Sequence, residues 1–192
     1  MKNVSSKLSV LRILLIASLF LIMIFPFEMF NFAFPSYIIN NKIIVNLRFI
    51  ISGVIFLITY LLSILSRIIL VRNNKAKNRD LINQLLDNVL LYMMLIILLG
   101  NGHVNILIVI TIVVCDLLIS YIKTITLYDI KSKFQSLKEI CIAISITFAL
   151  FYNLPFELLN IMIVDFLFVL SSIVSIISLY QYFEIYKNLK VE

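Results

Sequence analysis

Charged residues are scarce in this chain. Asp, Glu, Lys and Arg make up 14% of its 192 residues, against 62% hydrophobic residues, and the mean hydropathy is +1.11. A soluble domain is about half apolar and a quarter charged, and so few polar side chains could not cover the apolar surface of a water-soluble fold. The scarcity excludes an ordinary soluble protein and predicts an integral membrane protein.

Glycine, cysteine and histidine are also rare, with three, two and one residues. Cys115 and Cys141 lie inside apolar runs, without the spacing of a disulfide framework or a metal site, so we interpret them as small buried hydrophobes. His103 lies in a short segment between glycine and valine, where we expect a solvated loop residue.

The formal net charge of +6 comes from 16 Lys and Arg residues against 10 Asp and Glu residues. A nucleic-acid groove would need the basic residues on one continuous face. Here they lie in short segments between apolar runs, where they act as topology signals and as contacts for lipid phosphates. We therefore expect membrane lipids as partners and no nucleic acid.

Six apolar runs approach or exceed the roughly 20 residues that cross a bilayer. They are Leu8–Phe25, Ile43–Val71, Leu81–Leu99, Ile106–Tyr128, Leu137–Tyr152 and Leu158–Ile185. No small-residue cleavage site follows the first run, so we interpret it as a spanning helix and not as a signal peptide. The expected fold class is all-α, an integral membrane bundle of six transmembrane helices that forms a single domain over residues 1–192.

The basic residues alternate from one connection to the next. The N-terminal arm, the second and fourth connections and the C-terminal tail are basic, whereas the third and fifth connections contain no Lys or Arg. By the positive-inside rule this pattern places both termini in the cytoplasm, in agreement with six crossings. The expected location is the cell (cytoplasmic) membrane, as a multi-pass protein.

Ionisable groups inside a spanning helix cost about 2.5–3.5 kcal/mol on insertion scales, so each one is a functional-site hypothesis. Asn83 and Asp87 lie one helical turn apart and share a face, which predicts a polar patch inside the bundle near the cytoplasmic side. For Asp116, an internal pair with a nearby Lys or Arg is as good an account as a functional role. Arg12 and Arg67 lie near cytoplasmic ends, from which we expect them to reach the headgroups.

Several stretches of the chain, in their order and spacing, resemble the CDP-alcohol phosphatidyltransferases, and among these the bacterial phosphatidylglycerophosphate synthases. They are SKLSVLRILLI, SGVIFLITYLLSILSR, LINQLLDNVLL, and CDLLISYIK followed by SKFQSLKE. LINQLLDNVLL is similar to the aspartate-rich LDPLADKLL of the family. The resemblance covers most of residues 6–140 and implies a six-helix membrane enzyme, usually a homodimer, that transfers a phosphatidyl group from CDP-diacylglycerol to an alcohol.

The catalytic motif of this family holds two divalent cations with four aspartates, and in this chain the motif is degenerate. Only the fourth aspartate position is kept, as Asp87; the others fall on Ser63, Ser66 and Asn83, and a glycine position falls on Arg67. Two adjacent Mg²⁺ ions need several negatively charged oxygen ligands, which one carboxylate, one amide and two hydroxyls cannot supply. With Asp87 as a catalytic remnant, the pattern favours a protein that has lost phosphatidyl transfer.

The resemblance also implies contacts with lipid phosphates, and with CDP-diacylglycerol, through basic residues. These candidates are Arg12, Arg72, Lys123, Lys133 and Lys138. A non-catalytic protein of this kind needs no cofactor. It would handle lipid without chemistry, or act as a homodimer or as a heterodimer with an active paralogue.

Two alternatives stay open. A divergent but active enzyme that makes phosphatidylglycerophosphate would need Mg²⁺ or Mn²⁺ at Asp87 and Asn83, with help from Asp116 or from substrate phosphates. A six-helix substrate-binding subunit of a membrane transporter would fit the length and the number of helices. Against the transporter, three glycines leave the helices without small-residue packing motifs, and no polar pocket is visible toward the outside.

Overall fold

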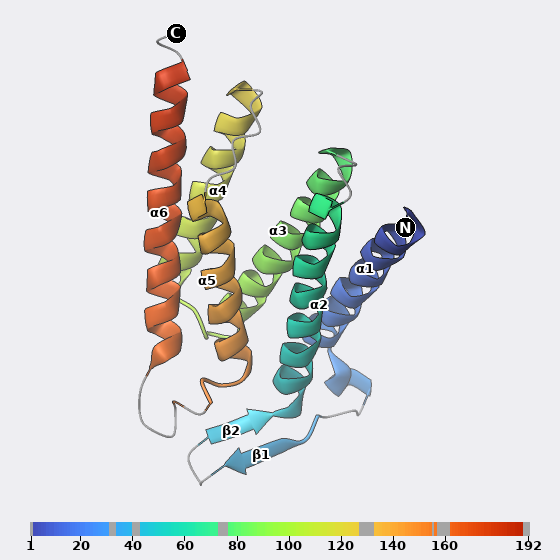
Figure 1. Cartoon of the computed structure of the whole chain (residues 1–192). Helices are drawn as coiled ribbons and strands as arrows, with labels where there is room; N and C mark the ends of the chain where they lie inside the picture. The colour runs from blue at the N-terminus through green and yellow to red at the C-terminus, as the bar shows by residue number, and fades with distance from the viewer. Residues whose placement is uncertain are drawn as a thin grey trace. The chain divides into compact units, whose positions relative to one another are not determined.

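A computed structural model describes residues 2–30, 34–39, 43–72, 77–126, 133–154, 156 and 162–189. Within these residues the chain is mainly helical, and its α-helices follow the order of the apolar runs (Figure 1). The helices are α1 (Lys2–Ile24), α2 (Leu47–Arg72), α3 (Lys77–Gly100), α4 (Ile106–Thr126), α5 (Lys133–Leu150) and α6 (Ile163–Leu189). The prediction of a helical chain is confirmed.

Four of the described helices are long and apolar enough to cross a bilayer. Their apolar parts are Leu47–Ile69 in α2, Asn83–Gly100 in α3, Ile106–Ile125 in α4 and Ile163–Asn188 in α6. In α1 the apolar part, Leu8–Ile24, is shorter, and α5 has only 18 residues. A membrane protein is supported by these four helices, and six crossings stay a prediction.

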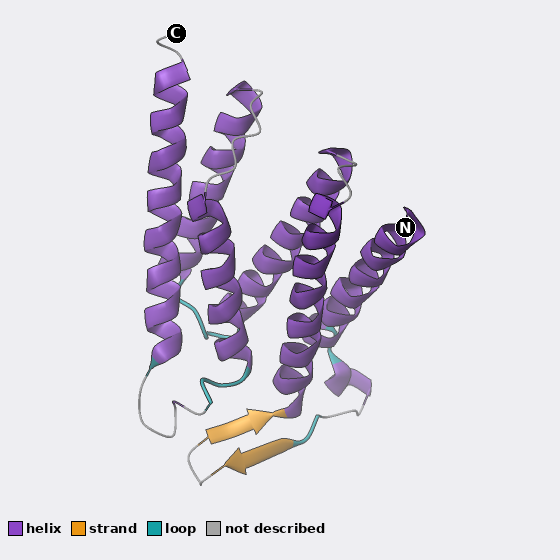
Figure 2. Ribbon diagram, viewed as in Figure 1, coloured by secondary structure: helices purple, strands orange, loops and turns teal. Residues whose placement is uncertain are grey.

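The connection between α1 and α2 contains structure that the sequence did not predict. Its described residues include a 3-10 helix, η1 (Phe27–Phe30). They also include an antiparallel β-hairpin of two strands, β1 (Ser36–Ile39) and β2 (Ile43–Asn46), which Figure 2 draws as orange arrows. The second apolar run was expected to be helical from Ile43 onward, and this is wrong for its first four residues. They are Ile, Ile, Val and Asn, and β-branched side chains favour a strand where a partner strand can pair with them.

Asn46 and Arg48 join the hairpin and α2 to the end of α1. The Asn46 Oδ1 accepts a hydrogen bond from the Arg48 backbone N–H (2.9 Å), which caps the N-terminus of α2. The Arg48 guanidinium donates through Nε to the Ile22 carbonyl (2.6 Å), and through Nη2 to the carbonyls of Met23 (2.7 Å) and Phe25 (2.9 Å). The Arg48 guanidinium thus satisfies the last carbonyls of α1, and its positive charge offsets the partial negative charge at the C-terminal end of that helix.

The described residues pack into two compact units. The first unit contains Met1–Ile97 and Leu150–Tyr152, and the second contains Leu98–Ala149 and Asn153–Glu192. In the first unit α1 packs along α2, and Gly53 of α2 lets Phe151 come close, since a Cβ at position 53 would lie 3.0 Å from the Phe151 ring. In the second unit α4 packs along α6. That both units belong to one transmembrane domain stays a prediction.

Each unit has an apolar interior, and its helices also carry apolar side chains on their outer faces. Side chains with no exposed surface include Leu19, Phe56 and Met94 in the first unit, and Ile112 and Ile146 in the second. Large apolar side chains are exposed along one side of α2, namely Val54, Ile58, Leu61, Leu65 and Ile68. A soluble protein rarely exposes an apolar surface of this extent, whereas lipid is a favourable solvent for it.

Candidate functional site

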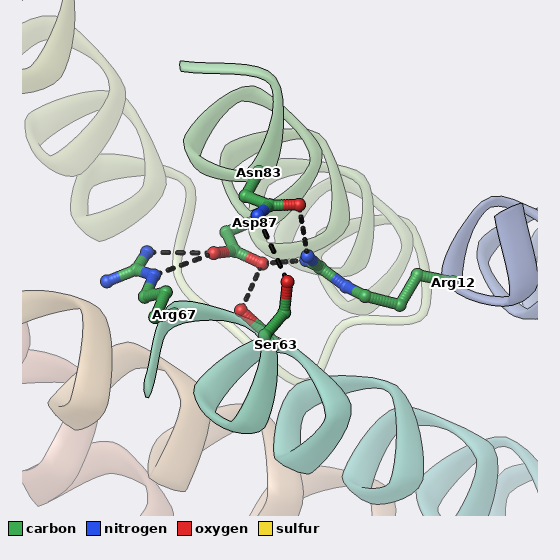
Figure 3. A network of polar contacts seen from close by, with 6 residues as sticks. Arg12, Ser63, Arg67, Asn83 and Asp87 are labelled. Atoms are coloured by element: carbon green, nitrogen blue, oxygen red, sulfur yellow. Dashed lines mark hydrogen bonds and ion pairs between the residues drawn. The ribbon is translucent and has the colours of Figure 1, made fainter. Parts of the chain in front are cut away.

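A network of polar side chains surrounds Asp87 in the first unit (Figure 3). Its members come from three helices: Arg12 from α1, Ser63, Ser66 and Arg67 from α2, and Asn83 and Asp87 from α3. The spacing i, i+3, i+4 on α2 and i, i+4 on α3 places the contributions of each helix on a single face. The structure thus brings together the four positions that the degenerate metal motif singled out.

Both carboxylate oxygens of Asp87 accept hydrogen bonds. Oδ1 is bonded by Nη2 of Arg12 and by the Ser63 hydroxyl (2.5 Å). Oδ2 is bonded by Nε (3.1 Å) and Nη2 (2.8 Å) of Arg67. The carboxylate therefore lies between two guanidinium groups.

Asn83 continues the network one turn from Asp87. Its Oδ1 accepts a hydrogen bond from Nη1 of Arg12 (3.2 Å), and its Nδ2 donates one to the Ser66 hydroxyl (3.0 Å). The amide thus serves as a relay between the arginine of α1 and a serine of α2. The acceptor oxygen of Asn83 is thus directed at the guanidinium of Arg12 and not at a metal ion.

The network is buried, and it carries a net positive charge. Arg12 has no exposed surface, and Asp87 is 2% exposed, whereas the Arg67 side chain is 34% exposed. Two guanidinium groups and one carboxylate leave a formal charge of +1. Nε of Arg12 is buried without a hydrogen-bond partner, so even this network does not fully satisfy the arginine.

The expectation that Arg12 reaches the headgroups is wrong, because its side chain points into the unit and pairs with Asp87. A buried charge is strongly stabilised by a hydrogen-bonded partner of opposite sign, and Asp87 is such a partner within reach of α1. Arg67 fits the expectation better, since part of its side chain stays exposed.

Ser63, Ser66, Asn83 and Asp87 do not have the donor set that two divalent cations require. The carboxylate oxygens of Asp87 are already bonded to Arg12 and Arg67, and the other three side chains are neutral. Among the residues that the structure describes, no three His, Cys, Asp or Glu side chains lie close enough to hold a metal ion. These residues therefore do not fit the pair of Mg²⁺ ions that the resemblance implies.

The second unit contains its own buried ion pair. The Lys138 ammonium of α5 bonds Oδ1 of Asp116 on α4, and the two residues are 3% and 9% exposed. Of the two accounts considered for Asp116, the internal pair is confirmed. A lipid-phosphate role for Lys138 stays a prediction.

Lys123, Gln135 and Tyr182 form a second polar group in the same unit. The Gln135 Oε1 accepts hydrogen bonds from Nζ of Lys123 (2.7 Å) and from the Tyr182 hydroxyl (2.7 Å). The Lys123 ammonium also lies 5.2 Å from the centre of the Tyr182 ring, a cation–π contact. Lys123 was expected among the lipid contacts, and neither of its two partners could be predicted from the sequence, because neither has a distinctive spacing to Lys123.

Arg72 and Lys133 are the remaining two candidate lipid contacts. The side chains of Arg72 and Lys133 lie outside the described part of the chain, although their backbones belong to α2 and α5.

No protein-family model matches the sequence, and no curated protein sequence matches it. The functional conclusion therefore depends on the chemistry of the Asp87 network and on the sequence resemblance.

Proposed function

We propose that this chain is a six-span membrane protein of the CDP-alcohol phosphatidyltransferase type that carries out no phosphatidyl transfer. In this proposal the former catalytic position has become part of a structural ion-pair network. The observation that supports it most directly is the engagement of Asp87, whose two oxygens are bonded by Arg12 and Arg67 respectively.

The bonding of Asp87 bears on both roles that the resemblance assigns to the aspartates. As a metal ligand, the carboxylate would have to release the guanidinium of Arg12 or Arg67 and bind a dication in its place. The other guanidinium would remain beside the dication and repel it. As a general base, it must lie within hydrogen-bond reach of the alcohol proton. Its oxygens already accept N–H and O–H donors, so an acceptor alcohol would have to displace one of them.

A protein of this type that carries out no phosphatidyl transfer can still bind lipid. The network has a net positive charge, and Arg67 is partly exposed, which favours an anionic lipid headgroup over a free cation at this place. We propose membrane lipid, including CDP-diacylglycerol, as the ligand class, and a second copy or an active paralogue as the protein partner. The cytoplasmic orientation of both termini belongs to the same proposal and depends on the distribution of basic residues.

The decisive assay measures release of CMP by the purified full-length protein. CDP-diacylglycerol, glycerol 3-phosphate and either Mg²⁺ or Mn²⁺ are supplied, with an active phosphatidylglycerophosphate synthase as the positive control. We expect no CMP above the protein-free background. CMP release that disappears in Asp87→Ala would overturn the proposal in favour of a divergent enzyme.

A restored variant tests the resemblance separately. Ser63→Asp, Ser66→Asp, Arg67→Gly and Asn83→Asp together return the acidic pattern of the family to this chain. A gain of metal-dependent CMP release in this variant would support the family fold. Co-purification of the wild-type protein with an ATPase module would instead favour the transporter alternative.

A further inference from the structure

The β-hairpin between α1 and α2 presents a bare apolar face. Ile38 of β1 and Ile44 of β2 lie directly opposite each other in the register, and they are 66% and 65% exposed. Because side chains alternate along a strand, their neighbour Val45 points to the other face, where it is 1% exposed. The hairpin thus packs Val45 against the first unit, although Tyr37, directly opposite Val45, is 57% exposed. The Ile38–Ile44 face is uncovered within that unit.

Hydrogen bonds and ring contacts attach the hairpin to the start of α2. The Leu47 N–H donates to the Pro35 carbonyl (3.1 Å), and the Asn46 N–H donates to the Tyr152 hydroxyl (3.1 Å). The rings of Phe49 and Tyr152 pack edge to face with centroids 5.5 Å apart. No residue separates β2 from α2, so the position of the hairpin follows from the position of that helix.

The length of α2 sets the depth of the hairpin in a bilayer. Its apolar part, Leu47–Ile69, has 23 residues and is about 34 Å long at about 1.5 Å per residue, slightly more than the roughly 30 Å of hydrocarbon. Leu47 therefore lies near the hydrocarbon boundary. Ile44 precedes it by three residues, at most about 10 Å of strand, and Figure 1 shows the strands crossing the end of α2 instead of continuing its axis.

The surroundings of the hairpin have the composition of a membrane interface. Phe25 and Phe30 stack at 5.4 Å, and Phe27 meets Phe34 at 5.2 Å. Tyrosine, with an apolar ring and a polar hydroxyl, gathers at the level of the headgroups in membrane proteins, and Tyr37 of β1 is 57% exposed. The strands SYII and IIVN carry no charge, whereas the water-facing side of an antiparallel sheet is normally polar.

The backbone of the hairpin places a limit on how deep it can lie. A two-stranded sheet has two edges with unpaired N–H and C=O groups, which cannot enter the hydrocarbon core. The headgroup layer supplies water and polar partners for these edges and apolar acyl segments for the isoleucines. A hairpin of two strands is marginal by itself in water, and burial of its apolar face would stabilise it.

We propose that the Ile38–Ile44 face is a lipid-contact surface that lies at the boundary between the phospholipid headgroups and the acyl chains. The occupant is phospholipid and not a second protein, because the face adjoins the apolar surface of a membrane-crossing helix at the depth of the headgroups. This surface is separate from the Asp87 network and from any role in lipid metabolism.

The chain contains no tryptophan, so Ile38→Trp in the full-length protein provides a single fluorescent reporter. The protein is reconstituted in phosphatidylcholine nanodiscs whose lipids are brominated either near the headgroup end or near the methyl end of the acyl chain. We expect a blue-shifted emission that is lost mainly with the shallow bromine and is protected from aqueous acrylamide. Ile58→Trp, on an exposed face about 16 Å along α2 from Leu47, is the control and should lose its emission mainly with the deep bromine.

Two results would overturn the proposal. Quenching of the Ile38→Trp protein by acrylamide but not by bromolipid would place the face in water. Protection from both quenchers, together with a doubled protein mass by light scattering, would place a second copy on it. Ile44→Trp, directly across the hairpin, repeats the measurement if the first variant loses its helix content or aggregates.

Discussion

Replacing Asp87 with asparagine tests whether this carboxylate neutralises buried arginine. The substitution keeps the shape of the side chain and removes the negative charge between Arg12 and Arg67. Arg12 has no exposed surface, so it cannot turn to water when its partner is lost. Arg67, with 34% of its side chain exposed, can hydrate and should contribute little to the loss.

The size of the effect follows from the burial of Arg12. Removing one partner of a buried ion pair costs about 3–5 kcal/mol, because the other charge stays buried and unpaired, and we expect a loss in this range for Asp87→Asn. Arg12→Met should cost less, about 1.5–3 kcal/mol, since Asp87 keeps its bonds from Arg67 and Ser63. The double variant contains no unpaired buried charge and should recover much of the stability lost in Asp87→Asn.

Unfolding of the detergent-solubilised protein by increasing fractions of SDS, followed by loss of helix content, measures these free energies. The four proteins form a double-mutant cycle, which isolates the coupling between residues 12 and 87. A change below about 0.5 kcal/mol in Asp87→Asn, the size expected for an ordinary surface substitution, would refute the reasoning. A double variant whose loss equals the sum of the two single losses would refute it as well.

Two further predictions use the same unfolding assay. Lys138→Met should lower the unfolding free energy by about 3–5 kcal/mol, because it removes the ammonium that pairs with the buried Asp116 carboxylate. Adding Asp116→Asn should restore most of the loss, and strictly additive losses would contradict the pairing. His103, in the turn between α3 and α4, is partly buried and not the solvated loop residue expected from the sequence. Its partial burial lowers its pKa below the ordinary value, so the unfolded chain binds more protons than the folded one as the pH falls. The unfolding free energy should therefore decrease as the pH falls from about 6.5 through the lower folded-state pKa; His103→Gln should remove this step, and an unchanged pH profile in that variant would assign it to another group.

The helices and the faces of their polar residues could be predicted from the sequence. Long apolar runs indicate helices because only an internally hydrogen-bonded backbone is stable in lipid, and an α-helix overlaps each of the runs in the structure. The i, i+4 spacing of Asn83 and Asp87 placed them on a common face, and their side chains do join one network. These predictions succeed because helical periodicity is local.

The pairing of the charges was decided by tertiary structure. Arg12 and Asp87 are separated by 75 positions in the sequence, and no local pattern indicates that α1 delivers its arginine to α3 and not to the headgroups. Only the packing of α1, α2 and α3 removes water from Arg12 and makes a buried carboxylate its best partner. The β-hairpin has the same explanation: Ile43 to Val45 are apolar enough for a helix, and the pairing with β1 selected the strand. The sequence by itself thus determined a helical membrane protein with a polar face near Asp87. The long-range packing determined that the protein's own guanidinium groups fill this face. The physical reason is that the choice of partner between distant residues depends on which helices exclude water from which charges.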